Sequence, residues 1–304
     1  MRLSITYHAE YRYEKPVSLS PQVIRLFPRD MLHARVESFR FETDNSADVH
    51  WRRDLFDNQV ARCFYPRELD TLVLTLKAGL EIKERNPFGF LLEARALSLP
   101  VQYDDRERRL LAAYFDGSAA VLPHALIPSD GLPTVEALLA MNHWIHKNIA
   151  YERREEGEAF TPEETLQRGR GACRDTAVLL AAAVRARGLA ARLASGYLWE
   201  STSHPADRKA ESALHAWTEV YLPGAGWLAL DPSNGVLTDH HYLTAAVGVS
   251  PVDIAPVAGV YFGQEWIPGR LKTSLRIERI QEGGPGDIPS PRSESPDTDG
   301  TGGA

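Results

Sequence analysis

Three residues, in the order Cys173, His215 and Asp231, carry side chains that together can attack a carbonyl group. His215 follows Cys173 by 42 residues, and Asp231 follows His215 by 16. A thiol can act as a nucleophile, an imidazole can accept and return its proton, and a carboxylate can hold the imidazole in one tautomer. Because the three residues are distant in sequence, the elements that carry them must bring them together.

The segment 172–187 predicts the helix that carries the thiol. Its apolar side chains recur at helical spacing, and Gly188 is placed to end it. The predicted buried face consists of Cys173, Ala177, Leu180, Ala181 and Val184. The positive end of a helix stabilises a thiolate, and its free N–H groups can bind an oxyanion. Simple core packing of a helix-facing cysteine is the alternative interpretation.

The hairpin 214–231 decides whether the imidazole and the carboxylate can meet. Alternation on a strand places His215 and Trp217 on one face. A four-residue loop, 223–226, would turn Asp231 to the other face. A five-residue loop, 222–226, pairs Tyr221 with Trp227 and sets Asp231 diagonal to His215 on the same face, within reach of a hydrogen bond. We predict the five-residue loop, and an Asp231 on the opposite face would exclude the triad.

Two aromatic residues near these elements are further substrate-binding candidates. Trp217 lies two residues after His215, and Tyr197 ends the strand predicted over 192–199. Core packing explains each of them equally well. Asp175 lies in the first helical turn, where the helix dipole alone accounts for an acid. The sequence assigns no second donor for an oxyanion.

Residues 1–100 predict an antiparallel β-sandwich, because short alternating segments are separated by turn signals such as Asp54–Asn58. From Thr134, a plausible N-cap, apolar residues follow helical spacing. Thr161-Pro162-Glu163-Glu164 predicts the start of a short helix that ends near Gly169. The polar segment 201–211 is expected to be a loop bordering the site, and 281–304, rich in Gly, Pro, Ser and Asp, is expected to be disordered.

Composition is that of a folded soluble chain: 304 residues, 43% hydrophobic and 25% charged. The net charge of -7 comes largely from the last 24 residues, which contribute -4. No basic face stands out, so we expect no nucleic-acid partner.

The cysteine content and the N-terminus bear on the compartment. Cys63 and Cys173 do not form a disulfide framework, although a single bridge between them stays open. The first eight residues contain no apolar signal core, and no segment approaches the roughly 20 apolar residues of a membrane span. We therefore expect a cytoplasmic protein without a membrane partner, in which the thiols stay reduced.

Histidine pairs raise the alternative of a metal site. His143 and His146 share one face of a predicted helix, while His204, His240 and His241 lie in predicted loops. Zinc needs three or four converging ligands, and the sequence indicates no such convergence. We predict no metal and no other cofactor, with His143 and His146 as a surface pair.

Four blocks around these residues resemble the transglutaminase-like core. They are Gly171 to Ala177, Arg187 to Tyr197, His215 to Tyr221 and Gly226 to Asn234. Their order and spacing make the resemblance specific. It implies a papain-like α+β core in which Cys173, His215 and Asp231 form a Cys-His-Asp triad. Proteins of this type are regarded as candidate cysteine proteases.

The resemblance extends to the N-terminal part. Tyr11-Arg12-Tyr13, Arg25 to Arg29 and Asn86-Pro87-Phe88 are similar to the β-rich N-terminal domain of bacterial transglutaminase-like proteins. Two departures stand out: Gly248-Val249-Ser250-Pro251 replaces an expected Gly-Arg-Asp-Tyr, and Asp57-Asn58 replaces a usual Gly-Asn turn. We expect a β-rich domain over 1–100, a catalytic core over 101–275 and a tail over 276–304.

These observations favour a cysteine-dependent amidase or peptidase that acts on a peptide or protein amide through a thioester acyl-enzyme. A transglutaminase, in which an amine resolves the same intermediate, is the first alternative, because water exclusion and pocket shape choose the acceptor. A catalytically silent peptide-binding module is the second. The oligomeric state is left open.

Overall fold

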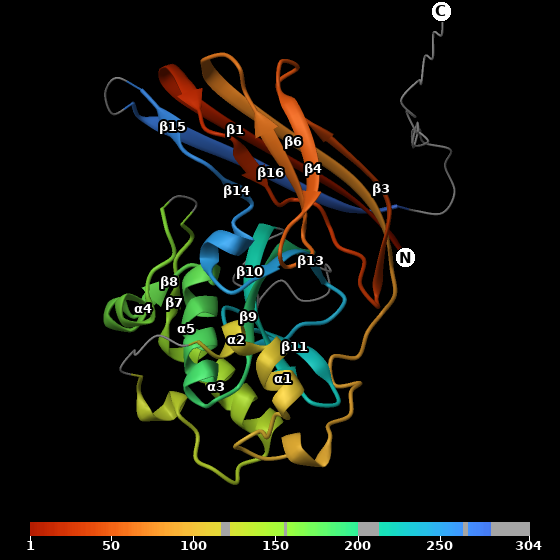
Figure 1. The fold of residues 1–304 in the computed structure, drawn as a ribbon, viewed down its shortest axis with the longest axis vertical. Helices are drawn as coiled ribbons and strands as arrows, with labels where there is room; N and C mark the ends of the chain where they lie inside the picture. The colour runs from red at the N-terminus through yellow and green to blue at the C-terminus, as the bar shows by residue number, and fades with distance from the viewer. Residues whose placement is uncertain (117–121, 155–156, 200–212, 264–266, 281–304) are drawn as a thin grey trace, which may run out of the picture.

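The computed structural model describes residues 1–116, 122–154, 157–199, 213–263 and 267–280, and it shows the expected α+β class. A β-sandwich forms one half of the molecule and a helix-covered sheet forms the other (Figure 1). The predicted loop 201–211 and the tail 281–304 lie outside the described residues. Among the residues described, no helix is long and apolar enough to cross a membrane.

The sandwich consists of two antiparallel sheets. The first contains β1 (Arg2–Leu19), β3 (Ala34–Glu42), β6 (Leu69–Ile82), β15 (Tyr261–Phe262) and β16 (Gly269–Ile280). The second contains β2 (Gln22–Ile24), β4 (Asp48–Arg53), β5 (Gln59–Phe64) and β14 (Val257–Ala258). Alternate residues of β1, from Leu3 to Ala9, are buried between the sheets, as the alternating pattern predicts.

The chain returns to this sandwich after the core. β16 pairs antiparallel with β1 from Tyr13 opposite Gly269 to Arg2 opposite Ile280. The boundary that we expected between 275 and 276 therefore falls inside a strand of the first sheet. The alternation of Leu271, Leu275 and Ile277 is the local signal for this strand, but its partner lies more than 250 residues away in sequence.

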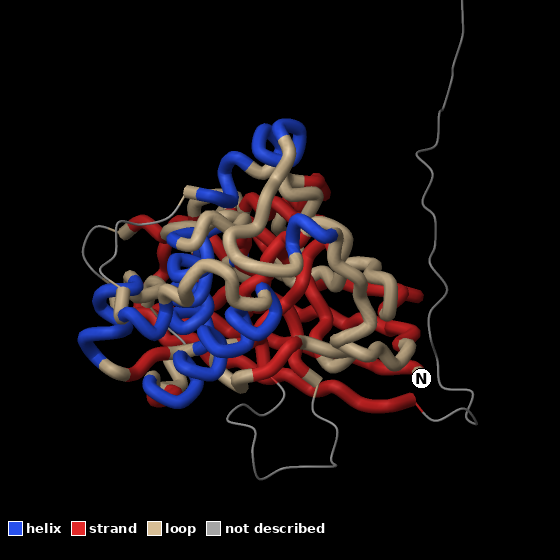
Figure 2. The backbone as a smooth tube through the Cα atoms, turned by 90° about the horizontal axis from the view of Figure 1, so that it is seen from below, coloured by secondary structure: helices blue, strands red, loops and turns tan. Residues whose placement is uncertain are grey.

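The second half is built around one five-stranded antiparallel sheet in the order β12-β11-β10-β9-β13. These strands are β9 (Ala191–Leu198), β10 (Ala213–Leu222), β11 (Gly226–Asp231), β12 (Val236–Leu237) and β13 (Tyr242–Gly248). The accompanying helices are α1 (Asp105–Leu110), α2 (Ala112–Phe115), α3 (Thr134–Asn148), α4 (Pro162–Arg168) and α5 (Cys173–Ala186). Short 3-10 turns span Ala94–Ala96, His124–Leu126 and Pro251–Ile254. The helices gather on one side of the molecule (Figure 2).

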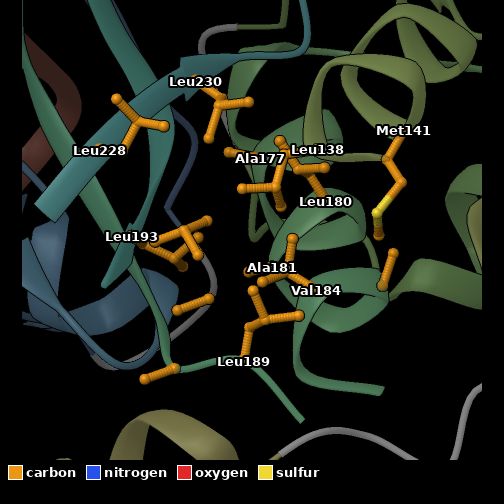
Figure 3. Packing of buried hydrophobic residues seen from close by; sticks show 14 of the residues in the cluster. Leu138, Met141, Ala177, Leu180, Ala181, Val184, Leu189, Leu193, Leu228 and Leu230 are labelled. Carbon is orange, nitrogen blue, oxygen red and sulfur yellow. The ribbon is translucent and has the colours of Figure 1, made fainter. Parts of the chain in front are cut away.

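α5 is the central helix of this half. Ala177, Leu180, Ala181 and Val184 are buried, as its apolar face predicts. They pack with residues of α3 and of the sheet strands in one cluster (Figure 3). Thr218 on β10 also donates a hydrogen bond of 2.8 Å to the carbonyl of Ala177. The helix axis is therefore fixed against the strand that carries His215.

Helix ends mostly follow the predicted capping signals. Thr161 accepts from the N–H of Glu164, whose carboxylate accepts from the N–H of Thr161, and Gly169 ends α4 with a φ of 62°. The predicted cap of α3 was wrong by one position, because Pro133 is the N-cap and Thr134 is the first, fully buried helical residue. Local side chains thus fix α4, whereas burial determines the start of α3.

The sandwich packs against the face of the core sheet that α5 leaves open. Asn58 donates to the carbonyl of Val247 at 2.7 Å and accepts from its N–H at 2.8 Å. The preceding Asp57 has a φ of 59°, which explains why glycine is usual at this turn and why aspartate can replace it. The Asp57-Asn58 departure therefore preserves a turn that joins the two halves.

Candidate active site

Cys173 is the first residue of α5, and its side chain is partly exposed. The N–H groups at the first positions of a helix have no acceptor within the helix, and the dipole places partial positive charge there. The prediction that the thiol lies at a helix N-terminus is therefore confirmed. Cys63, on β5, is buried in the sandwich, and both cysteines are free, so no bridge joins them.

Asp175 anchors the start of this helix. Its carboxylate is fully buried and accepts two hydrogen bonds from Arg154, at 2.7 and 2.8 Å. It also accepts from the N–H groups of Phe160 at 2.8 Å and Ala172 at 2.7 Å. A Cβ on Gly171 would lie 2.9 Å from the Cβ of Asp175, so only glycine fits there. The helix dipole alone was an incomplete explanation of this acid.

The hairpin has the register that the sequence analysis predicted. Tyr221 pairs with Trp227 as predicted, but Leu222 also pairs with Gly226. The connecting loop is therefore 223–225, and the predicted five-residue loop was wrong by one residue at each end, because the strand pairing continues one step further in the same register. Extending this register by one residue beyond Thr218 and Leu230 sets Asp231 opposite Trp217. His215 and Asp231 are joined by a hydrogen bond of 2.8 Å between Nε2 and Oδ2. The two side chains therefore lie on one face, which satisfies the condition set for the triad.

Asp231 is held by a dense set of donors. Oδ2 also accepts from the hydroxyl of Tyr242 and from Nδ2 of Asn234, each at 2.7 Å. Oδ1 accepts from the N–H of Ser233 at 2.8 Å. With so many donors the carboxylate can neither rotate nor take up a proton easily, so it keeps the imidazole in one orientation.

The surroundings shift the pKa values of Asp231 and His215 in opposite directions. Burial raises the pKa of Asp231, but the charge and hydrogen bond of His215 and the bonds from Tyr242 and Asn234 outweigh it, so the net pKa is lowered. Burial lowers the pKa of His215, but Asp231 and Cys173 together raise it well above its ordinary value. The carboxylate is thus ionised and the imidazole favours its protonated form.

The same charges act on the nucleophile. Burial raises the pKa of the Cys173 thiol, yet the charge of His215, its hydrogen bond and a bond from the backbone of Ala216 bring the net pKa below its ordinary value. Nε2 of His215 bonds to Asp231, so the buried Nδ1 is the nitrogen available to the sulfur of Cys173. The arrangement favours a thiolate-imidazolium pair.

The two aromatic candidates lie deeper than a substrate can reach. Tyr197 is fully buried between the two halves and donates from its hydroxyl to the carbonyl of Leu26 at 2.5 Å. Trp217 is 1% exposed and stacks near His215 with ring centroids 6.5 Å apart. Tyr197 therefore joins the halves, and Trp217 supports the imidazole from inside the protein.

The histidine pairs have separate positions. His146 bonds through Nδ1 to the carbonyl of Ser233 at 2.8 Å, so α3 braces the turn after Asp231, and His143 does not join it there. His204 lies outside the described residues. Asp239, His240 and His241 each bring a ligand atom within 4.8 Å of the others, a convergence that the sequence did not indicate. Since Asp239 already bonds Nδ1 of His241 at 2.8 Å, these side chains hold one another in place.

Sequence reasoning missed Tyr242, Asn234 and the anchoring role of Asp175. Asn234 lies three residues after Asp231, in a turn that the sequence blocks include, so its position was a usable signal. Tyr242 reaches Asp231 from β13, across the intervening strands β10 and β9 in the sheet order. No local pattern indicates a contact of that kind.

Comparison with known proteins gives the family relationship. Residues 3–81 match the Bacterial transglutaminase-like N-terminal region, and residues 127–232 match the Transglutaminase-like superfamily. Uncharacterized proteins of Mycobacterium tuberculosis and Mycobacterium leprae are 28% and 24% identical, each over 86% of this chain and over 88% and 94% of their own lengths.

A solved structure shares the whole architecture. The crystal structure of a candidate cysteine protease from Cytophaga hutchinsonii matches with a TM-score of 0.68 over 92% of both chains, at 15% identity. This similarity shows the fold and not the activity. The two matching regions show that the chain has a transglutaminase-like core behind a bacterial transglutaminase-like N-terminal region.

Proposed function

We propose that this protein is a cysteine-dependent amidase or peptidase in which Cys173, His215 and Asp231 are the catalytic residues. The observation that carries the proposal is the 2.8 Å bond between His215 and Asp231 beside a thiol at a helix N-terminus. A histidine oriented by a buried carboxylate and adjacent to a nucleophile is the arrangement that acyl transfer requires.

In the first half of the reaction, the thiolate of Cys173 attacks the carbonyl carbon of an amide. A C–S bond forms, and the carbonyl π electrons move to oxygen to give a tetrahedral oxyanion. His215, protonated as its raised pKa favours, gives a proton to the leaving nitrogen as the C–N bond breaks. The products of this step are an amine and a thioester on Cys173.

In the second half of the reaction, neutral His215 takes a proton from a water molecule as the oxygen of that water attacks the thioester carbonyl. The C–S bond breaks, the acid leaves and the thiolate-imidazolium pair returns. An amine that takes the place of water would make the same site a transferase, which is the alternative function. We place water first because the structural neighbour is a candidate protease.

The proposed substrate is an amide in a peptide or protein, and the proposed location is the cytoplasm. A net charge of -7 gives no support for a nucleic-acid substrate. A thiol nucleophile also works only while reduced, which the cytoplasm ensures.

The test is to incubate the protein with a peptide thioester or activated ester and a labelled primary amine. We expect mass spectrometry to find the acyl group on Cys173 and the free acid as the main product. Cys63→Ala should keep the modification, and Cys173→Ala should lose it. The amine adduct as main product would favour the transferase, while no acylation of Cys173 with any acyl donor would favour the silent binding module.

A further inference from the structure

Tyr151 is held directly beside the segment that leads to the nucleophile. It lies on the short strand β7 (Ala150–Tyr151), which pairs in parallel with β8 (Arg170–Gly171) so that Tyr151 is level with Gly171. The N–H of Ala150 bonds to the carbonyl of Gly169, and that of Glu152 to Gly171, both at 2.9 Å. These strands lie beside the start of α5 in Figure 1.

The chain after Tyr151 is tied to the same helix. Arg174, the residue next to the nucleophile, donates to the carbonyl of Arg154 at 2.7 Å. Arg154 in turn holds both oxygens of Asp175. The backbone at Tyr151 is therefore fixed to the segment that leads into α5, and the chain that follows is fixed to the first turn of that helix.

The phenol of Tyr151 is available for a further hydrogen bond. The side chain is only half-buried, and its hydroxyl has no hydrogen-bond partner among the described residues. In contrast, the hydroxyls of Tyr103, Tyr197 and Tyr242 donate to Tyr221, Leu26 and Asp231, respectively. Among these tyrosines near the site, Tyr151 is the one whose hydroxyl the fold leaves unused.

The groups around this phenol keep it protonated. Burial, and after it the charge of Cys173, raise the pKa of Tyr151 to about 12, and Asp231 adds to the rise. Arg153 and Arg174 oppose it. The hydroxyl therefore stays protonated across the physiological range and can donate a hydrogen bond at the pH at which the thiolate forms.

We propose that Tyr151 is a catalytic residue whose hydroxyl donates a hydrogen bond to the oxyanion of the tetrahedral intermediate on Cys173. The helix N–H groups supply one side of the oxyanion site, and the phenol supplies the second donor. No proton is transferred: when the C–N bond breaks, the oxyanion electrons re-form C=O and the phenol keeps its hydrogen. This inference rests on the proposed acyl chemistry of Cys173.

The test compares Tyr151→Phe with wild type in two reactions of Cys173. Acylation by an activated peptide ester passes through an oxyanion, so kcat/KM should fall by about 10²-fold with KM little changed. Alkylation by iodoacetamide forms no oxyanion, so its rate should not change. Tyr114→Phe is the matched control, because Tyr114, on α2, is also half-buried but packs against Trp227 on β11, and this variant should leave both rates unchanged.

Equal losses in both reactions would show that Tyr151 only supports the thiol, and an unchanged acylation rate would overturn the proposal directly. A peptide aldehyde gives a readout without turnover, because its adduct with Cys173 places an oxygen where the oxyanion forms. We expect Tyr151→Phe to weaken aldehyde binding; equal binding by both proteins would also overturn the proposal. If wild type is alkylated but binds no aldehyde and accepts no acyl group, the proposed function fails, and this inference with it.

Discussion

The two cysteines of this chain occupy opposite environments. Cys63 lies on β5 inside the sandwich, where burial raises its pKa to about 11. Cys173 lies at the N-terminus of α5 in the core, where the net pKa falls below its ordinary value. The same side chain is thus an inert packing group in one half of the molecule and a candidate nucleophile in the other.

Burial alone does not explain the difference, because it raises the pKa of both thiols, although Cys173 is the more exposed of the two. The hydrogen bond from Tyr65 lowers the pKa of Cys63 only in part. At Cys173 a charged imidazole and a backbone N–H outweigh the effect of burial. A functional cysteine is therefore identified by the cation and donors around it and not by its degree of burial.

Alkylation by iodoacetamide should show the largest difference between the two sites. We expect Cys173 to react about 10²-fold faster than Cys63 at neutral pH, because only Cys173 has a substantial thiolate fraction. Its rate should rise with pH at values below the ordinary thiol pKa, since its own pKa is lowered. Peptide mapping by mass spectrometry measures both rates in one sample.

The His215→Ala variant tests whether the imidazole causes this difference in reactivity. His215→Ala removes the main group that lowers the pKa of Cys173, so its alkylation should slow at neutral pH and shift toward higher pH. Equal rates at both cysteines in wild type, or no effect of His215→Ala, would contradict the distinction between the two sites.

The anchor of α5 should give the next largest effect. Asp175→Asn removes the charge that pairs with Arg154 at 2.7 Å. We expect a loss of about 2–3 kcal/mol in the free energy of unfolding. This is less than for a fully buried ion pair, because Arg154 is partly exposed. Urea unfolding measures it. Asp57→Asn, which breaks the exposed pair with Arg53 in the sandwich, should cost only a few tenths of a kcal/mol. Similar losses in both variants would contradict an anchoring role for Asp175.

Tyr242→Phe should have a smaller and pH-dependent effect. Losing its bond to Asp231 should cost about 1.5 kcal/mol of stability near neutral pH. The folded pKa of Asp231 is lowered, so the stability that its ionised form contributes is complete above the unfolded pKa of about 3.9 and is lost as pH falls through the folded pKa. The difference between variant and wild type should therefore shrink in acid.

Unfolding measured across pH tests this dependence. Tyr103→Phe is the control, because that hydroxyl donates to a backbone carbonyl and its loss should cost the same at every pH of this range. A Tyr242→Phe difference that stays constant from neutral to acid pH would show that the phenol does not act through the carboxylate.

These contacts also show what sequence could and could not predict. Capping signals predicted α4, alternation predicted the face of His215, and the pairing of Tyr221 with Trp227 predicted the register that brings Asp231 to it, although the loop is shorter than predicted. Such features depend on a few neighbouring residues. Tyr242, Tyr151 and β16 depend on pairings between distant strands, and local periodicity carries no information about which strands become neighbours.

Cys63→Ala should give the smallest effect. Removing a buried sulfur leaves a small cavity, so we expect a loss of about 1 kcal/mol in stability and acylation of Cys173 within about twofold of wild type. Thermal unfolding and the ester assay measure the two quantities. A fall in acylation comparable to that of Cys173→Ala would mean that the sandwich cysteine takes part in the chemistry. Because β5 holds Cys63 in the packed interior of the sandwich, on a different sheet from His215 and Asp231, its loss should reach Cys173 through the small change in stability.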